Sequence, residues 1–252
     1  MMAACVTVRT ASGRGEFLVR NRILREFASA SPGDYERFAQ ALEPIVLRRG
    51  EILGTAKKRP EFVHFVESGI ISLVATTLAG HSLDVAIVGN EGVAGIADAL
   101  GQHPLPYAWV VQLDGAAYRT PIEVIRTEIL TCSDLHRLLM EYSQAVVHQL
   151  TQSAVCNRFH TVTQRLSRWL LLTADRAGTL QFELTHELMA QMVGAPRSAV
   201  SQAAARLRGQ GVIDYHRGVL TIRDGKRLER VACECFATIS LVLRQTGPSP
   251  ER

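Results

Sequence analysis

Four polar side chains within the six residues 197–202 carry the chemistry that proteins use to read nucleic-acid bases. They are Arg197, Ser198, Ser201 and Gln202. Arginine can bond both acceptors on a guanine edge, glutamine can pair with adenine, and serine can bond to either. Helical spacing would place these side chains opposite an apolar face. That face consists of Val200, Ala204 and Leu207.

The residues just before them predict a first helix and a sharp turn. Thr185 is a favourable N-cap, and Gly194 tolerates the positive φ that a tight turn requires. Pro196 suits the first turn of the next helix, where its missing N–H is not needed. The pattern is typical of a helix-turn-helix whose first helix buries Leu188, Met189 and Met192.

A predicted β-hairpin follows the two helices, and the surrounding region is basic. Two β-rich runs in 211–222 meet at Arg217-Gly218, which indicates a wing. Residues 161–230 carry 11 Lys and Arg against 6 Asp and Glu, whereas residues 1–160 carry 15 against 16. A basic module beside a neutral one favours a polyanionic partner for the C-terminal part.

The first half of the chain is rich in short apolar runs punctuated by turn residues. This pattern favours an antiparallel β-roll of the double-stranded β-helix or jelly-roll type, preceded by two helices within 21–42. With the C-terminal helices, the expected fold class is α+β. The predicted strands are residues 45–47, 51–53, 62–66, 70–76, 83–88, 108–113 and 116–118.

A long helix is expected over 133–159, which contains neither Gly nor Pro. Positions alternating by four and three form a heptad seam, which favours a dimerisation helix because a helix of this length overshoots a small domain. The alternative is a core helix packed on its own chain. The seam consists of Leu135, Leu139, Tyr142, Val146, Gln149, Ser153 and Cys156.

Taken together, these motifs resemble the Crp–Fnr family of bacterial regulators over about residues 21–228. The segment LTHELMAQMVGAPRSAVSQAAARL is similar to the family's DNA-binding signature, and GVIDYHRGVLTI to its wing. FVHFVESGIISLV and VGNEGVAGIADALG resemble parts of its cyclic-nucleotide-binding-like roll. The expected domains are a flexible tail (1–20), an effector domain (21–132), a dimerisation helix with hinge (133–160) and a winged helix-turn-helix domain with a C-terminal helix (161–252).

The resemblance implies a cytoplasmic homodimer, joined through helix 133–159, on palindromic double-stranded DNA, with RNA polymerase as a further partner. The resemblance also implies that Arg197, Ser198, Ser201 and Gln202 contact DNA bases and that Thr185 contacts the DNA backbone. An effector pocket would lie near Glu91, Gly92 and Tyr107. However, Pro106 stands where members that bind cyclic AMP have an arginine for the cyclic phosphate. We therefore expect no ordinary binding of cyclic AMP, and the effector is unknown.

Other chemistries are disfavoured by the same sequence. An iron–sulfur cluster needs several closely spaced thiolates, and the N-terminal segment has only Cys5. Cys233 and Cys235 are expected in one helix (228–243), pointing apart, as ordinary buried cysteines. No histidine has a distinctive setting for haem, and no catalytic motif is present, so we expect no enzyme, cofactor, metal site or membrane span. The competing hypothesis is a ligand- or partner-sensing roll whose winged helix docks another protein. The histidines that could in principle bind haem are His64, His81, His103, His136 and His148.

Overall fold

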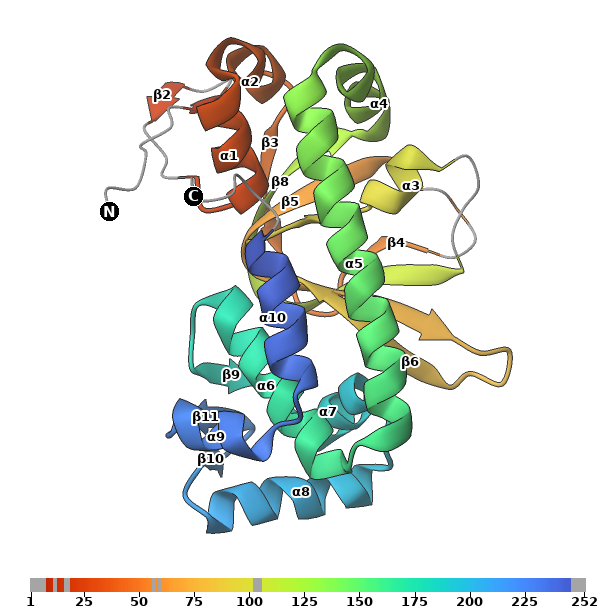
Figure 1. The fold of residues 1–252 in the computed structure, drawn as a ribbon, viewed down its shortest axis with the longest axis vertical. Coiled ribbons are helices and arrows are strands. Elements are labelled where there is room, and N and C mark those ends of the chain that lie inside the picture. Colours follow the sequence, from red (N-terminus) through yellow and green to blue (C-terminus); the bar gives the residue numbers. More distant parts are fainter. Residues whose placement is uncertain are drawn as a thin grey trace.

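The computed structural model describes residues 8–10, 13–15, 19–55, 58, 60–101 and 106–245. An N-terminal β-roll with short helices lies at one end, and a helical domain with a small sheet lies at the other. The long helix α5 (Ser133–Phe159) runs alongside both (Figure 1). This arrangement confirms the α+β class with an N-terminal antiparallel sheet and a C-terminal helix-turn-helix domain.

The described part of the N-terminal segment forms a small hairpin, in which β1 (Val8–Thr10) pairs with β2 (Gly13–Gly15). The helices α1 (Arg22–Ala30) and α2 (Pro32–Ala39) follow. The buried Asn21 side chain caps α1 by accepting from the Leu24 N–H at 3.1 Å. Its amide also donates to the carbonyls of Val66 and Gly92, at 2.9 and 2.8 Å. One buried side chain thus connects the start of α1 to the roll.

The roll is an antiparallel sheet with strand order β3-β8-β5-β6. Two short strands lie off this path, β4 pairing with β8 and β7 with β5. The strands are β3 (Glu43–Leu47), β4 (Ile52–Gly54), β5 (Phe62–Thr76), β6 (Ser82–Val88), β7 (Val93–Ala94) and β8 (Tyr107–Pro121).

The predicted strands 62–66 and 70–76 are joined in β5, and 108–113 and 116–118 are joined in β8, so the predicted breaks between them were wrong. Ser68-Gly69 and Asp114-Gly115 sit instead at a bulge where the pairing register shifts. There the two strands approach so closely that a Cβ on Gly115 would lie 2.1 Å from the Ser68 carbonyl oxygen. Glycine in a strand can mark such an approach as readily as a turn.

The helix α5 has the predicted bounds, but its heptad seam does not face outward. Leu135, Leu139 and Tyr142 are buried in the core of their own chain. Farther along, the buried Gln149 amide reaches the Ile87 carbonyl of β6 at 3.5 Å. The alternative of a helix packed on its own chain therefore holds for the seam. The remaining helices of this half are α3 (Ile96–Leu100) and α4 (Ile122–Thr131).

The C-terminal part has its own core, built on α6 (Val162–Ala177). Thr161 begins α6 with a capping box, and Gly178 ends it in the left-handed conformation. The three-stranded sheet has the order β10-β11-β9. No helix among the described residues is long and apolar enough to span a bilayer. The other elements are β9 (Gln181–Glu183), α7 (His186–Val193), α8 (Arg197–Gly209), β10 (Ile213–His216), β11 (Val219–Ile222), α9 (Gly225–Val231) and α10 (Cys235–Gln245).

Candidate nucleic-acid interface

The turn between α7 and α8 follows the predicted geometry. The Thr185 hydroxyl accepts from the Leu188 N–H at 3.1 Å and so caps α7. Gly194 ends α7 at φ +59° and ψ +48°, in the left-handed region. Pro196 directly precedes α8, which begins at Arg197. The start of α7 and the turn into α8 therefore depend on one helix cap and one glycine.

Three of the four candidate base-reading side chains are exposed at the start of α8: Arg197, Ser198 and Gln202. Ser201 is half-buried, and its hydroxyl lies 2.8 Å from His186 Nδ1 at the start of α7. The four residues share one helix face as predicted. However, the Ser201 hydroxyl already has an internal partner in this structure.

The His186 ring connects α8 to the wing, a role that the sequence analysis missed. It stacks on Tyr215 of β10 with ring centroids 4.8 Å apart and an interplanar angle of 23°. The Tyr215 hydroxyl donates to the Leu184 carbonyl at 2.8 Å. The contacts from Ser201 through His186 to Tyr215 hold α8 and the wing in one arrangement.

The predicted wing is present. β10 and β11 pair antiparallel, and Arg217 (φ +50°) and Gly218 (φ +82°) form the turn between them. Two successive residues of positive φ are typical of the tight turn that matches the twist of a hairpin. The Gly218 carbonyl accepts from the Leu184 N–H at 2.8 Å, which anchors the wing to the domain.

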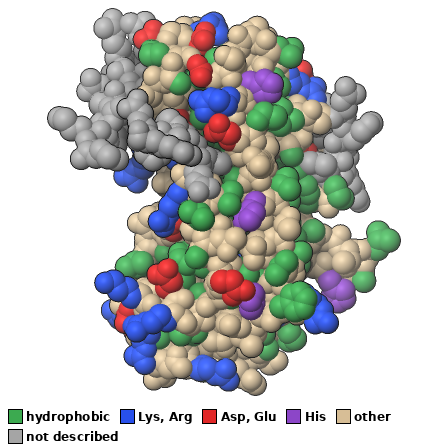
Figure 2. Space-filling model, viewed as in Figure 1, with side chains coloured by type: hydrophobic (Ala, Val, Ile, Leu, Met, Phe, Trp, Pro, Cys, Tyr) green, Lys and Arg blue, Asp and Glu red, His purple; other side chains and the backbone are tan. Residues whose placement is uncertain are grey.

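Basic side chains gather over the C-terminal part, toward the lower end of the face shown in Figure 2. Asp214 neutralises some of this charge, since it lies 3.0 Å from Arg223 and 3.8 Å from Arg208. An anionic backbone would meet a basic surface here. Exposed basic residues of this part are Arg197, Arg206, Arg208, Arg217, Arg223, Lys226, Arg227 and Arg230.

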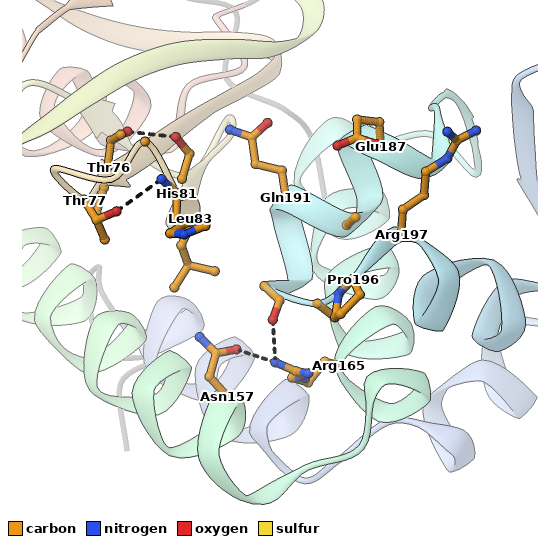
Figure 3. A pocket seen from close by; sticks show the side chains of 16 residues that line it. Thr76, Thr77, His81, Leu83, Asn157, Arg165, Glu187, Gln191, Pro196 and Arg197 are labelled. Carbon is orange, nitrogen blue, oxygen red and sulfur yellow. Dashed lines mark hydrogen bonds between the residues drawn. The ribbon is translucent and has the colours of Figure 1, made fainter.

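The β5–β6 hairpin of the roll faces the helix-turn-helix across a groove of about 950 Å³ (Figure 3). Thr77 and His81 line the hairpin side, and Gln191 lines the α7 side. The packing is close, because a Cβ on Gly194 would lie 2.6 Å from Leu83 Cδ1. The roll therefore contacts the helix-turn-helix directly at its turn.

The three candidate effector residues have different neighbours. Glu91 is buried, accepts from the Gly89 N–H, and lies 3.3 Å from Arg176 Nε of α6. Gly92 packs on α5, where a Cβ would meet the Tyr142 hydroxyl at 2.1 Å. Tyr107 packs edge-to-face on Trp109. Glu91 also lines a cavity of about 240 Å³, whose lining includes neither of the other two.

The cysteines near the C-terminus were wrongly placed in one continuous helix. α9 ends at Val231 and α10 begins at Cys235, so Cys233 lies in the break between them. The break lets Cys233 and Cys235 turn toward the same point, where they meet Cys156 and His160. The reason for expecting them to point apart does not apply.

The fold and the interface are those of a DNA-binding regulator of the winged helix-turn-helix class that has an antiparallel roll on its N-terminal side. Residues 164–231 match the family described as the Crp-like helix-turn-helix domain. The chain is 22% identical, over 213 residues, to the CRP-like cAMP-activated global transcriptional regulator of Mycobacterium tuberculosis. That match covers 82% of this chain and 95% of the relative.

Solved structures share the same fold. FixK2 from Bradyrhizobium japonicum superposes with a TM-score of 0.65 at 17% identity, covering 76% of this chain and 98% of that one. The c-di-GMP responsive global regulator CLP of Xanthomonas campestris gives a TM-score of 0.61 at 16% identity, covering 76% and 99%. The chain therefore has the fold of these regulators, and its residues 164–231 match the Crp-like helix-turn-helix domain.

Proposed function

We propose that this protein is a transcription regulator of the Crp–Fnr type that acts as a homodimer and binds a palindromic DNA site. The observation that carries the proposal is the exposed cluster of Arg197, Ser198 and Gln202 at the N-terminus of α8, within the Crp-like domain. Side chains at this end of a recognition helix are those that reach base edges in the major groove. Ser201 would join them by releasing His186, and Thr185 would contact the DNA backbone.

The proposed dimer forms through the outward face of α5 rather than through the predicted seam. Met140, Val147 and Val155 lie seven and eight residues apart, on one side of the helix, and are 38%, 62% and 41% exposed. An apolar stripe of this kind on a long helix suits a second copy of the same helix. The proposed organisation keeps an effector domain at 21–132, the dimer helix and hinge at 133–160, and the DNA-binding domain at 161–252.

We further propose that the roll does not bind cyclic AMP in the usual way. Glu91 is engaged by Arg176, and Pro106 supplies no positive charge for a phosphate. Two relatives are named for responses to cAMP and to c-di-GMP, so effector chemistry varies among proteins of this fold. A protein that works on DNA alongside RNA polymerase would act in the cytoplasm.

DNA binding is tested by titrating the full-length protein with labelled duplex at several salt concentrations. Affinity should fall steeply with salt as phosphate contacts are lost. Arg197→Ala should cost about 1–3 kcal/mol on a specific site. The matched control is Arg25→Ala, because Arg25 is exposed on α1, far from α8 (Figure 1). Salt-independent binding, or equal losses in the two variants, would favour the alternative of a protein-docking winged helix.

The dimer is tested by sedimentation of the full-length protein. Val147→Glu should shift it toward the monomer, because a charge would enter the apolar stripe. Leu130→Glu is the matched control, since Leu130 is 85% exposed on α4 and outside α5. A wild-type protein that sediments as a monomer at micromolar concentration contradicts the homodimer.

A further inference from the structure

Four side chains that are common metal ligands converge at the end of α5. Cys156 lies in the last turns of this helix, and His160 is its C-cap. Cys233 comes from the break before α10, and Cys235 is the first residue of α10. Their ligand atoms all lie within 4.8 Å of one another. This group is not apparent in the sequence because 72 residues lie between His160 and Cys233.

The distances match the edges of a tetrahedron around one small ion. Cys156 Sγ lies 3.5 Å from Cys233 Sγ, and Cys235 Sγ lies 3.5 Å from His160 Nδ1. With metal–sulfur bonds of about 2.3 Å, a tetrahedral zinc site has edges of about 3.7 Å. Three cysteines and one histidine form a recognised structural zinc set. We propose that Cys156, His160, Cys233 and Cys235 bind a single divalent ion of the zinc type.

The surroundings hold two of these ligands in orientations that suit a metal. His160 Nε2 lies 3.2 Å from the Glu234 carboxylate, which leaves Nδ1 turned toward Cys235. A carboxylate on the far nitrogen of a ligating histidine fixes its tautomer and strengthens its basicity. The Gln152 amide donates to Cys235 Sγ at 3.0 Å, a contact that suits a thiolate.

Positive charge beside the cysteines fits the charge that the metal complex would have. Each thiol releases its proton to water on binding, so three thiolates and a divalent ion carry one net negative charge. Arg165 and Arg168 are both buried, and within the described chain the Nε of each has no hydrogen-bond partner.

A disulfide explains the group less well than a metal does. A disulfide between Cys156 and Cys233 would not account for the position of Cys235 or the orientation of His160. Cys132 shows how an ordinary buried cysteine looks in this chain, since its thiol lies 3.6 Å from Asp34 Oδ2 and it is not part of this group of metal ligands. The proposed ion would link the end of α5, which meets α6, to the break between α9 and α10.

The test begins with the full-length wild-type protein, purified in a reducing buffer and analysed by elemental mass spectrometry. We expect about one equivalent of zinc per chain. Exchange with Co²⁺ should give the visible bands of a tetrahedral site and thiolate-to-cobalt charge transfer. Cys156→Ser and Cys233→Ser should lose the metal, whereas Cys132→Ser should retain it. Glu234→Gln should weaken affinity by about 10–100-fold while the fold persists.

The wild-type measurements decide the matter even if the cysteine variants fail to fold. The proposal is wrong if the reduced protein, with all its thiols reactive, takes up neither Zn²⁺ nor Co²⁺ stoichiometrically. It is equally wrong if bound cobalt shows no thiolate charge transfer, or if Cys156 and Cys233 form a disulfide that persists in the reducing buffer.

Discussion

Arg176 joins three parts of the chain, so its loss should unfold the protein more readily than any surface change. Its side chain is 2% exposed. It pairs with Glu91 at 3.3 Å, donates to the Gln149 side chain at 2.9 Å, and also donates to the Ile87 carbonyl. The roll, the long helix and the first helix of the DNA-binding domain thus meet at one guanidinium group. We consider Arg176→Met, which keeps an unbranched side chain but removes the charge and the donors.

The expected loss follows from what the substitution leaves behind. Glu91, whose side chain is 10% exposed, would lose Arg176 and keep the hydrogen bond from the Gly89 N–H. Breaking a buried ion pair from one side typically costs about 3–5 kcal/mol. At about 2–4 °C per kcal/mol for a chain of this size, Tm should fall by roughly 6–20 °C. Arg37→Met, at a half-exposed arginine that pairs with Asp34 and Glu128, should cost less, about 1 kcal/mol for each pair.

The assay is urea unfolding of the wild type, Arg176→Met, Glu91→Gln and the double variant, followed by circular dichroism. Removing the charge from Glu91 should make the arginine substitution cheaper, so the double variant should lose less stability than the sum of the two single losses. The reasoning fails if Arg176→Met costs no more than Arg37→Met, or if the two single effects are additive.

Three further changes test other parts of the structure. Gly194→Ala should destabilise by about 1–2 kcal/mol, because alanine is strained at positive φ and its Cβ would lie 2.6 Å from Leu83 Cδ1. Gly209→Ala, with open space around it, should be neutral or stabilising, and equal effects of the two substitutions in urea unfolding would refute this reasoning. Ser201→Ala should cost about 1 kcal/mol through the unpaired His186, whereas Ser198→Ala on the same helix should change stability by less than about 0.5 kcal/mol. Burial raises the pKa of Asp84 to about 7, so this carboxyl binds its proton more tightly in the folded state than in the unfolded state. The contribution of Asp84 to stability therefore falls as the pH rises from 4 to 7. Asp84→Asn should therefore gain up to about 4 kcal/mol relative to the wild type over that interval, and a pH-independent difference between the two unfolding curves would contradict this.

The DNA-binding half could be predicted closely because its determinants are local. The cap at Thr185, the glycine at 194 and the proline at 196 act on their immediate neighbours. The bounds of α5 were likewise encoded by an unbroken helical run. By contrast, the partner of a buried face depends on the whole fold. The α5 seam was therefore assigned to a second copy, although it packs on the roll of its own chain.

The features that the sequence could not show all join distant segments. Ser201 contacts His186, Arg176 contacts Glu91, and Cys156 contacts Cys233, each across 15 or more positions. Periodicity says nothing about such pairs. The unexpected break between α9 and α10 has a similar origin. Each of the two helices packs on α6, and α10 also packs on α5, so tertiary contacts decide where the chain bends.

Selection from a pool of random duplexes tests the proposed DNA recognition most directly. We expect the full-length protein to enrich a palindrome with two half-sites about 34 Å apart, one helical turn of DNA. The same selection with Arg197→Ala should relax the preference at one position in each half-site. If no sequence is enriched above the starting pool, or only a single half-site is, the proposed dimeric reading of DNA through α8 is wrong.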